Sequence, residues 1–262
     1  MFRGKLMLLV IDVGNTNIVL GLYNGPNLMK SWRMATGENR TSDEIGLFIY
    51  NLLNHAKVAP DGLTDIIVSS VVPNIMYSLT NGIRKYFNVL PIIVNRHMNM
   101  GGFRLSGGRE LGSDRIANCV AGHGLYGGPI IIIDYGTATT YDVVSENGEF
   151  LTGITAPGIK ISAEALTGRA ALLGRIELIL PSSLMISTTT ESVQAGVLYG
   201  AIGETEYIVG RLRKEIDRPK CVVIATGGLA NTISKGTNIF DHIVPSLTLD
   251  GLRLLYEMNK NE

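Results

Sequence analysis

Cysteine and charged side chains are scarce in this sequence. Its 262 residues include only two cysteines, Cys119 and Cys221, which lie far apart and show no CxxC spacing. Two cysteines exclude a disulfide scaffold, and we interpret both as reduced, buried thiols. Charged residues make up 18% of the chain, and 23 basic side chains balance 23 acidic ones. A neutral chain offers no long-range attraction to nucleic acid or anionic lipid, so we expect neither as a partner.

Long hydrophobic runs are also missing. The apolar stretch at residues 6–13 is interrupted by Asp12 and is too short to cross a bilayer, and no targeting segment is convincing. We therefore expect a cytoplasmic protein. The hydrophobic content of 45% is too high for a disordered chain, and the length suits one large domain or two small ones.

Several common nucleotide and metal motifs are absent or misplaced. The sequence has no GxxxxGK[ST] segment, which excludes a P-loop. A GxGxxG match at residues 122–127 precedes an apolar strand instead of following one, so it indicates a helix end and a loop. The four histidines lack the spacing of a metal site. None of these signals assigns a function.

An internal repeat is the most informative feature present. Residues 8–16 and 130–140 each contain an apolar run, an Asp-x-Gly turn and then small hydroxyl or amide residues. Alternating apolar residues and an Asn-Gly turn follow both copies, a pattern that predicts a strand, a tight turn, a strand, a hairpin and a strand. The repeat therefore predicts two related lobes.

Helices and strands are predicted to alternate through the rest of each half. Residues 42–56 have helical spacing and open on Ser42 as a cap, and residues 75–87 also favour a helix. In the second half, Thr188 and Glu191 form a capping box that opens a long amphipathic helix. β-branched runs predict strands at residues 66–72, 91–94 and 221–225. This alternation indicates an α/β fold with partly parallel sheets.

The first Asp-x-Gly turn has the groups that a phosphate site needs. Asp12 ends a buried strand, where a carboxylate requires a hydrogen bond, an opposite charge or a cation. Gly14 permits close backbone approach, and the turn amides with the Thr16 hydroxyl could hold phosphate oxygens, with Asp12 acting through Mg²⁺. The alternative is an ordinary capped turn. The second copy at Asp134 favours a nucleotide between two lobes.

Two further segments have a functional and a structural interpretation. Asp114 lies in the first turn of a predicted helix, where it could act as a general base or simply favour the helix dipole. Arg115 beside it could bind an anionic substrate group in a bidentate pair. Gly227 and Gly228 follow a strand and could let adenine or ribose lie against bare backbone, or could form a simple turn.

In order and spacing, residues 12–16, 112–115 and 134–140 resemble the type III pantothenate kinases. The likeness covers nearly the whole chain. It implies the actin-like ATPase fold of the acetate and sugar kinase, heat-shock chaperone and actin superfamily. Two duplicated RNase H-like lobes, residues 1–113 and 114–262, would enclose the nucleotide. The resemblance also implies ATP-dependent phosphorylation of pantothenate, the first step towards coenzyme A, by a homodimer that needs a monovalent cation such as K⁺ or NH₄⁺.

The same resemblance implies roles for individual residues. Asp114 would be the proton acceptor, Asp134 would bind the monovalent cation, and Asp12 is a possible Mg²⁺ ligand through phosphate. Contacts to ATP would come from Asp12, Val13, Gly14, Asn15, Thr16, Asn17, Ile18, Val19 and Thr137. Contacts to pantothenate would come from Leu105, Gly112, Ser113, Asp114 and Arg115, and from Thr189 of the second subunit.

Three departures from the family pattern surround the expected acceptor pocket. Leu105 stands where the family has a tyrosine, and residues 172–174 and 186–188 also differ. Loss of one buried hydrogen bond costs about 1–3 kcal/mol, or roughly 10- to 150-fold in affinity. Two alternatives therefore stay open: a kinase of the same fold with another small hydroxyl acceptor, and a catalytically weak relative with a regulatory or accessory role.

Overall fold

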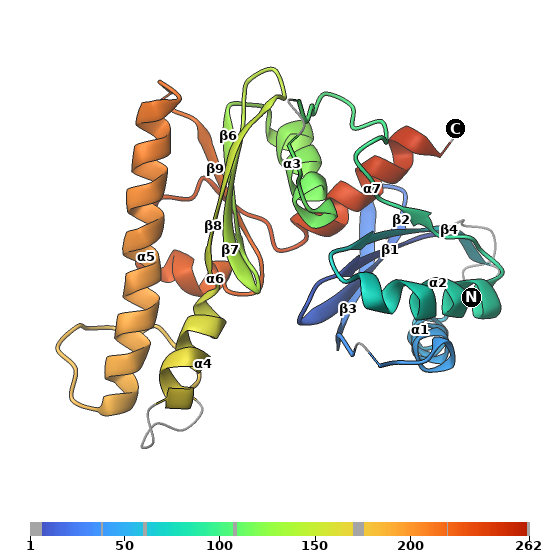
Figure 1. Cartoon of the computed structure of the whole chain (residues 1–262), viewed down its shortest axis with the longest axis horizontal. Coiled ribbons are helices and arrows are strands. Elements are labelled where there is room, and N and C mark those ends of the chain that lie inside the picture. The colour runs from blue at the N-terminus through green and yellow to red at the C-terminus, as the bar shows by residue number, and fades with distance from the viewer. Residues whose placement is uncertain are drawn as a thin grey trace. The chain divides into compact units, whose positions relative to one another are not determined.

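The computed structural model describes residues 7–37, 39–59, 62–106, 109–169, 176–218 and 220–260. The chain forms two compact units (Figure 1). Unit 1 comprises Met1–Gly101, Gly107–Ala121 and Leu247–Glu262, and unit 2 comprises Gly102–Ser106 and Gly122–Ser246.

Unit 1 is built on a five-stranded sheet of order β3-β2-β1-β4-β5. β1 pairs antiparallel with β2 and parallel with β4, and β3 and β5 are the edge strands. Its elements are β1 (Met7–Val13), β2 (Asn17–Asn24), β3 (Asn27–Ala35), α1 (Ser42–His55), β4 (Leu63–Ser70), α2 (Pro73–Phe87), β5 (Ile92–Ile93), the first part of α3 (Ser113–Tyr126) and α7 (Leu247–Asn259).

Both faces of β1 are buried over residues 7–11, which explains the unbroken apolar run before Asp12. Leu9, Ile11 and Val13 alternate onto one face, where they pack with apolar residues of α1 and α2. Val10 points to the other face, where the side chains of Val10 and Leu249 both approach Gly21. Helices therefore cover this sheet on both sides.

The N-cap of helix α1 lies one residue earlier than expected. Thr41 is the N-cap residue, because its side chain accepts a hydrogen bond from the backbone N–H of Glu44 while the Glu44 carboxylate accepts one from the backbone N–H of Thr41. The prediction of Ser42 as the cap was wrong. The reciprocal bonds need a Glu three residues after the cap, and Thr41 has that spacing whereas Ser42 does not.

Helix α7 comes from the end of the sequence and packs on β1, β2 and β4 of unit 1. The Tyr23 hydroxyl in β2 donates to Asp250 at 2.7 Å, and the Tyr256 hydroxyl donates to Asp65 in β4 at 2.6 Å. Gly251 lies against the backbone of α3, since a Cβ built on it would be 2.0 Å from the Ala117 carbonyl oxygen. This close contact places the start of α3 on the same body as β1.

Unit 2 repeats the sheet of unit 1 with the order β10-β9-β6-β7-β8. β6 pairs antiparallel with β7 and parallel with β9, as β1 does with β2 and β4, so the predicted duplication is confirmed. Its elements are the end of α3, β6 (Ile130–Tyr135), β7 (Ala138–Val144), β8 (Phe150–Pro157), α4 (Ile159–Arg169), α5 (Thr189–Glu215), β9 (Val222–Thr226), α6 (Ala230–Ile233), η2 (Ser234–Gly236) and β10 (His242–Ile243).

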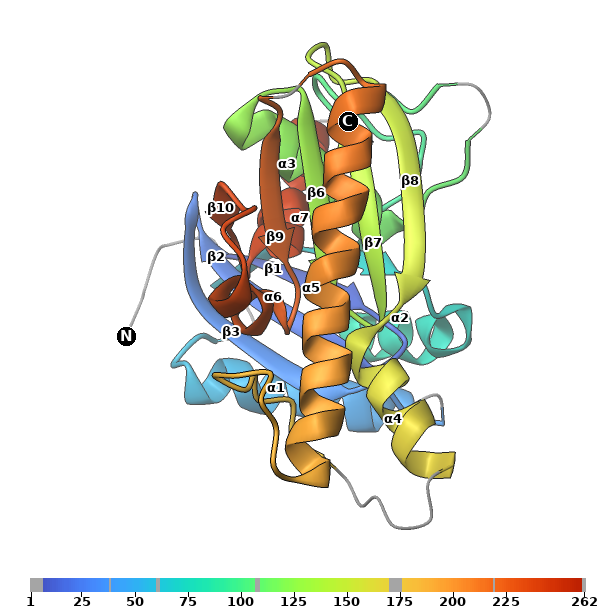
Figure 2. The same ribbon diagram turned by 90° about the vertical axis from the view of Figure 1, so that its left-hand side faces the viewer.

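The long helix α5 lies across one face of this sheet (Figure 2). Its buried residues Leu198, Ile202 and Val209 belong to the same core as Ile131 and Ile133 of β6. As predicted, Thr188 is the N-cap and accepts a hydrogen bond from the Glu191 backbone at 3.2 Å. Of the apolar residues that predicted this helix, Ile202, Val209 and Leu212 are buried on the sheet, whereas Val197 and Ile208 are only partly buried.

The two units differ from the expected division at residues 113 and 114. Unit 1 extends through Ala121 and also includes α7, because these segments pack on the sheet of β1.

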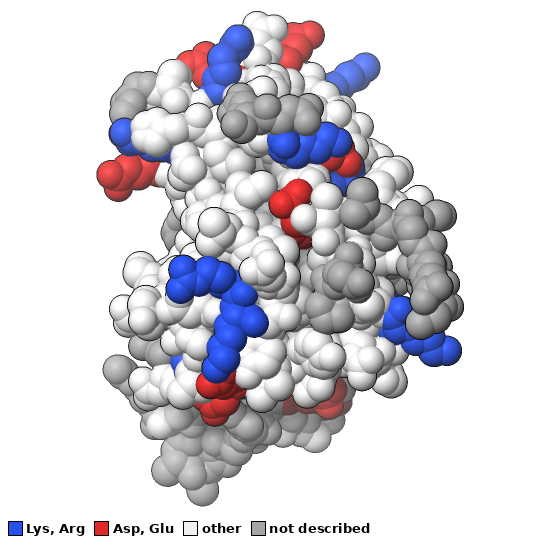
Figure 3. All heavy atoms as spheres, turned by 90° about the vertical axis from the view of Figure 1, so that its right-hand side faces the viewer, with Lys and Arg blue, Asp and Glu red and all other residues white. Residues whose placement is uncertain are grey.

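Among the described residues, no helix is both long and apolar enough to cross a membrane. On the face shown in Figure 3, described basic and acidic side chains lie in small separate groups, and neither sign covers a continuous area.

The contact between α7 and α3 gives a first prediction. We expect Gly251→Ala to lower the free energy of unfolding by about 1–3 kcal/mol, because the added methyl group overlaps backbone that cannot yield easily. Gly203→Ala on α5 is the control, since a Cβ there meets nothing within 4 Å; it should be neutral or stabilising by about 0.5–1 kcal/mol. Urea unfolding measures both, and equal midpoints for the two variants would contradict the close contact.

Candidate functional site

The turn after β1 is held in place by Thr36, the residue that follows β3. The N–H of Gly14 donates to the carbonyl of Asn17 at 3.0 Å. The Thr36 hydroxyl donates to the carbonyl of Gly14 at 2.6 Å, and the Thr36 N–H donates to the carbonyl of Thr16 at 3.0 Å. These bonds fix the turn while the side chains of Asn15 and Thr16 stay exposed. Thr36 was not identified from the sequence, because nothing local marks its contact with a turn twenty residues earlier.

Residues 12–19 were predicted to contact ATP, and the structure shows which of them could do so through a side chain and which only through the backbone. Val13 and Ile18 point into the core of unit 1 and are essentially fully buried. Only their backbone groups could meet a ligand. Asn15 and Thr16 are the exposed members of the turn.

Asp12 belongs to a chain of hydroxyl groups that crosses from β1 to α3. In the parallel pairing, Asp12 lies opposite Ser69 at the end of β4. The buried Ser69 hydroxyl donates to Asp12 Oδ1 at 3.0 Å and lies 3.1 Å from the Ser113 oxygen. Ser113 accepts from the N–H of Ser70 and donates to the carbonyl of Ser70, both at 3.0 Å. The ends of two strands and the start of α3 are thus joined by hydrogen bonds.

The Ser69–Ser70 pair is a functional element that the site prediction left out. Its signal was present, since two small hydroxyl residues end a strand of β-branched residues. Sequence alone could not assign their partner, because Ser113 lies more than 40 positions away. In the structure, Ser113 acts through its hydroxyl as the link between β4 and the helix that bears Asp114.

Asp114 occupies the first turn of α3 beside a glycine that leaves room for it. The Gly112 carbonyl accepts the first helical hydrogen bond from Ile116 at 2.9 Å. Asp114 Oδ1 accepts from the N–H of Arg115 at 2.8 Å, and the side chain is partly exposed. A Cβ at position 112 would be 2.5 Å from Asp114 Oδ1. Gly112 therefore permits a conformation in which the carboxylate can meet a ligand.

The second Asp-x-Gly turn is shorter and is enclosed by two glycines. Gly136 N–H donates to the Ala138 carbonyl at 3.1 Å, so two residues connect β6 and β7 where three connect β1 and β2. A Cβ on Gly158 would be 2.0 Å from the Thr137 carbonyl oxygen. Gly227 has φ +88°, and a Cβ there would be 2.4 Å from Asp134 Oδ1. Backbone therefore packs directly against this turn on two sides.

Asp134 occupies in unit 2 the place that Asp12 occupies in unit 1. It pairs with Thr226 of the parallel strand β9, as Asp12 pairs with Ser69 of β4. Strand alternation puts Asp134 on the opposite face of β6 from its buried neighbours Ile133 and Tyr135. The repeat in the sequence thus identifies two structurally equivalent carboxylates.

The predicted site residues fall into two described sets. In unit 1, residues 12–19 and 112–115 lie on one body and are joined through Ser69. In unit 2, Asp134 and Thr137 share a turn. Leu105 follows the bridge between Arg104 and Glu149, and Thr189 is exposed at the start of α5. Residues 107–108 and 172–174 lie outside the described part, and a nucleotide position between the lobes stays a prediction.

The donors near the first turn suit a magnesium ion that accompanies phosphate. Within the described residues, no three His, Cys, Asp or Glu side chains converge as a metal cage. Mg²⁺ usually binds through one or two carboxylates, phosphate oxygens and water, so a lone Asp12 carboxylate matches its requirements. The backbone amides that follow Gly14 and the Thr16 hydroxyl are suitable donors to phosphate.

Comparison with solved structures defines the class of fold. The chain matches a conserved Baf family protein from Campylobacter jejuni, described as a transcriptional activator, with a TM-score of 0.58, 20% identity and coverage of 97% of this chain and 100% of that one. It also matches the ROK hexokinase from Thermus thermophilus with a TM-score of 0.50, 14% identity and coverage of 98% and 100%. At these identities the likeness shows the fold alone, that of the two-lobed, actin-like ATPases and sugar kinases.

Sequence comparison then identifies the family. The family model for type III pantothenate kinase matches residues 8–211. A type III pantothenate kinase from Agathobacter rectalis is 48% identical over 252 residues, covering 95% of this chain and 96% of that protein. The chain therefore belongs to the type III pantothenate kinase family.

The hydroxyl chain can be tested by removing its central member. We expect Ser69→Ala to lower the free energy of unfolding by about 1–3 kcal/mol, because Asp12 loses a buried hydrogen bond. Turnover should fall as well, since Asp12 loses the hydrogen bond that orients its carboxylate. Ser78→Ala on α2 is the control in the same unit, where the described residues show no side-chain hydrogen bond to lose. Urea unfolding and steady-state kinetics measure the effects, and unchanged stability and turnover would contradict the role of Ser69.

Proposed function

We propose that Asp12, Asp114 and Asp134 have separate roles in the reaction that family membership gives this chain. That reaction is the ATP-dependent phosphorylation of pantothenate to 4'-phosphopantothenate, the first step of coenzyme A biosynthesis. The observation that carries the proposal is a set of three hydrogen bonds at the end of β4, one from Ser69 to Asp12 and two between Ser70 and Ser113. Together they fix the phosphate-side carboxylate relative to the helix of Asp114.

Asp114 is the proposed general base. It accepts the proton of the primary hydroxyl of pantothenate as that oxygen attacks the γ-phosphate, and Arg115 binds the carboxylate of the substrate. Phosphoryl transfer depends mainly on positioning and on the neutralisation of charge. A base whose helix is bonded to the strand ends of β1 and β4 suits that requirement.

The Asp-x-Gly turn of unit 1 is the proposed phosphate site. Backbone amides of residues 15 and 16 and the Thr16 hydroxyl donate to phosphate oxygens, and Asp12 holds Mg²⁺. A bound Mg²⁺ offsets negative charge on the phosphates. Thr36 keeps the turn carbonyls away from the ligand by engaging those of Gly14 and Thr16.

Asp134 and Thr137 are the proposed second half of the site. Asp134 binds the monovalent cation, K⁺ or NH₄⁺, and Thr137 contacts ATP. The equivalence of Asp134 and Asp12 in the two sheets supports this assignment. We further propose a homodimer in which Thr189 of one subunit contacts pantothenate bound to the other, and a cytoplasmic location where ATP is supplied; both rest on the resemblance.

Replacing the proposed base should separate catalysis from binding. We expect Asp114→Asn to lower kcat by roughly 10²- to 10⁴-fold, because Asn cannot accept the proton, with ATP affinity and unfolding unchanged. The measurement is pantothenate-dependent ADP release with Mg²⁺ and either K⁺ or Na⁺, and K⁺ should give the faster rate.

Asp217→Asn is the matched control for this change. Asp217 is exposed and has φ 50°, a conformation that Asn tolerates, so this variant should keep full activity. A near-normal rate for Asp114→Asn would refute the general-base role. ATP binding without pantothenate-dependent turnover in the unmodified chain would instead indicate the regulatory relative.

Leu105 tests the identity of the acceptor. If pantothenate occupies a pocket beside this residue, Leu105→Tyr should lower KM for pantothenate roughly 10-fold or more by adding one hydrogen bond, with kcat little changed. Leu105→Phe supplies the ring without the hydroxyl and should lack this gain. Faster turnover of a different small hydroxy acid than of pantothenate would favour the kinase of altered acceptor specificity.

A further inference from the structure

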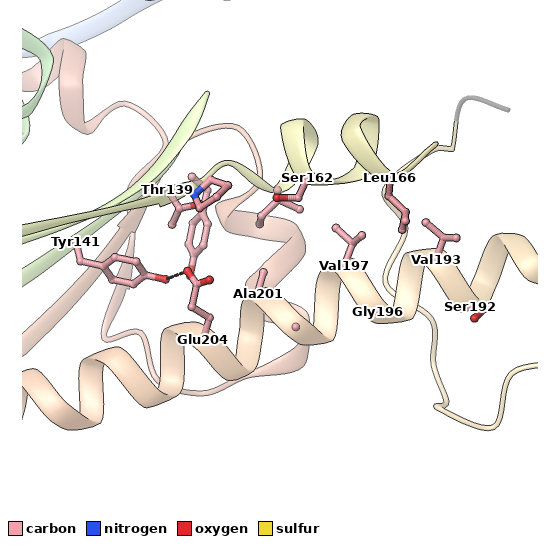
Figure 4. A pocket seen from close by; sticks show the side chains of 14 residues that line it. Thr139, Tyr141, Ser162, Leu166, Ser192, Val193, Gly196, Val197, Ala201 and Glu204 are labelled. Carbon is pink, nitrogen blue, oxygen red and sulfur yellow. Dashed lines mark hydrogen bonds between the residues drawn. The ribbon is translucent and has the colours of Figure 1, made fainter. Parts of the chain in front are cut away.

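Unit 2 contains a cavity on the α5 side of its sheet, away from the face that carries Asp134. The cavity has a volume of about 460 Å³ and lies among α4, α5 and the ends of β6, β7 and β8. This size is within the range of small-molecule sites. Figure 4 shows side chains from α4 and α5 pointing toward each other across it.

One end of the cavity is a directed chain of hydroxyl groups that ends on a carboxylate. The Tyr141 hydroxyl donates to Glu204 Oε1 at 3.0 Å, as the dashed line in Figure 4 marks. Because its proton is used there, Tyr141 accepts from Thr205 at 3.2 Å, and Thr205 in turn accepts from Tyr135 at 2.8 Å. Burial raises the pKa of both tyrosines, which keeps them protonated as donors.

This chain of donors orients Glu204 but supplies no positive charge. Among ion pairs within the described residues, none involves Glu204. The carboxylate is exposed, so a solute can reach it from water. Such a group favours a cationic partner and repels phosphates and carboxylates, which makes the cavity a poor site for ATP or pantothenate.

The other end of the cavity is apolar. Val193, Val197 and Leu166 line it, and all three point into the space between the helices in Figure 4. Gly196 and Gly200 of α5 also face it, and a Cβ on either would meet no atom within 4 Å. Two missing side chains on one helix face keep the groove open, so a hydrocarbon chain can lie along it.

We propose that this cavity binds a small organic ammonium ion, with its charged nitrogen at Glu204 and its hydrocarbon part between α4 and α5. The site is separate from Asp134, because strand alternation places Tyr135 and Asp134 on opposite faces of β6. It is nevertheless adjacent to the second Asp-x-Gly turn, since Tyr135, Thr139 and Pro157 line the cavity and also flank residues 136–138 and Gly158. The proposal does not depend on the acceptor of the kinase.

The test compares three probes of similar size on the full chain. Calorimetry or ligand-observed NMR should detect binding of n-pentylammonium, and should show at least about tenfold weaker binding of 1-pentanol and of pentanoate. Equal binding of all three would mean that Glu204 does not select charge. No binding of n-pentylammonium at all would overturn the proposal.

Two variants locate the binding. Glu204→Gln keeps an acceptor for Tyr141 but removes the charge, and should weaken n-pentylammonium at least about tenfold without changing its affinity for ATP. Gly200→Leu fills the groove and should weaken n-pentylammonium and 1-pentanol alike. Glu215→Gln, on the same helix outside the cavity, is the control and should bind as the unmodified chain does. Unchanged n-pentylammonium affinity in both cavity variants would place the ligand elsewhere and refute the site.

Discussion

A carboxylate at the end of a buried strand is the constraint on which the rest of unit 1 depends. Asp12 follows five apolar residues of β1 that are buried on both faces, so its charge needs hydrogen bonds close at hand. Ser69 supplies one, and Ser69 can do so only because β4 runs parallel to β1 in the observed register. The same serine lies beside Ser113, which brings α3 and Asp114 to the strand ends. Solvation of one charge thereby positions a second charged group.

Unit 2 meets the same constraint with different means. Asp134 also ends a buried strand and pairs with Thr226 as Asp12 pairs with Ser69, but the next residue of β9's end is Gly227, whose bare backbone approaches Asp134, where unit 1 has Ser70. The connecting turn is one residue shorter and is packed against Gly158. Duplication has therefore preserved the sheet order and the position of the carboxylate, while the groups around each carboxylate have diverged. This difference is compatible with distinct ions at the two turns.

Much of the fold could be predicted because it depends on local patterns. Apolar runs ending in Asp-x-Gly gave both central strands, and the Thr188–Glu191 spacing gave the start of α5. Contacts between distant segments could not be predicted in this way. Examples are the hydrogen bonds from Thr36 to Gly14 and from Ser69 to Asp12, and the close approach of Gly251 to Ala117. In each case neither sequence segment indicates that the other is its partner. The return of α7 to unit 1 was missed for the same reason.

The candidate site was predicted unevenly for a physical reason. Asp12, Asp114 and Asp134 could be identified from the sequence, because each is a charged residue within a recognisable motif. Ser69, which supports Asp12, was not among the predicted residues, and the bonds of the Ser113 hydroxyl to Ser70 could not be foreseen, because both depend on how the strands are placed. The cavity near Glu204 is a further case, since glycines on a helix indicate an open groove only after the opposing helix α4 is in place.

The position of α7 has a consequence for synthesis of the chain on the ribosome. Unit 2 is almost continuous in sequence, whereas unit 1 requires residues 247–259, which are made after every strand of both sheets. Until α7 emerges, Leu8, Val10 and the Tyr23 ring on one face of the first sheet lack their cover. Unit 1 thus completes its folding after the strands of unit 2 have been made, and until then its apolar face is open to aggregation.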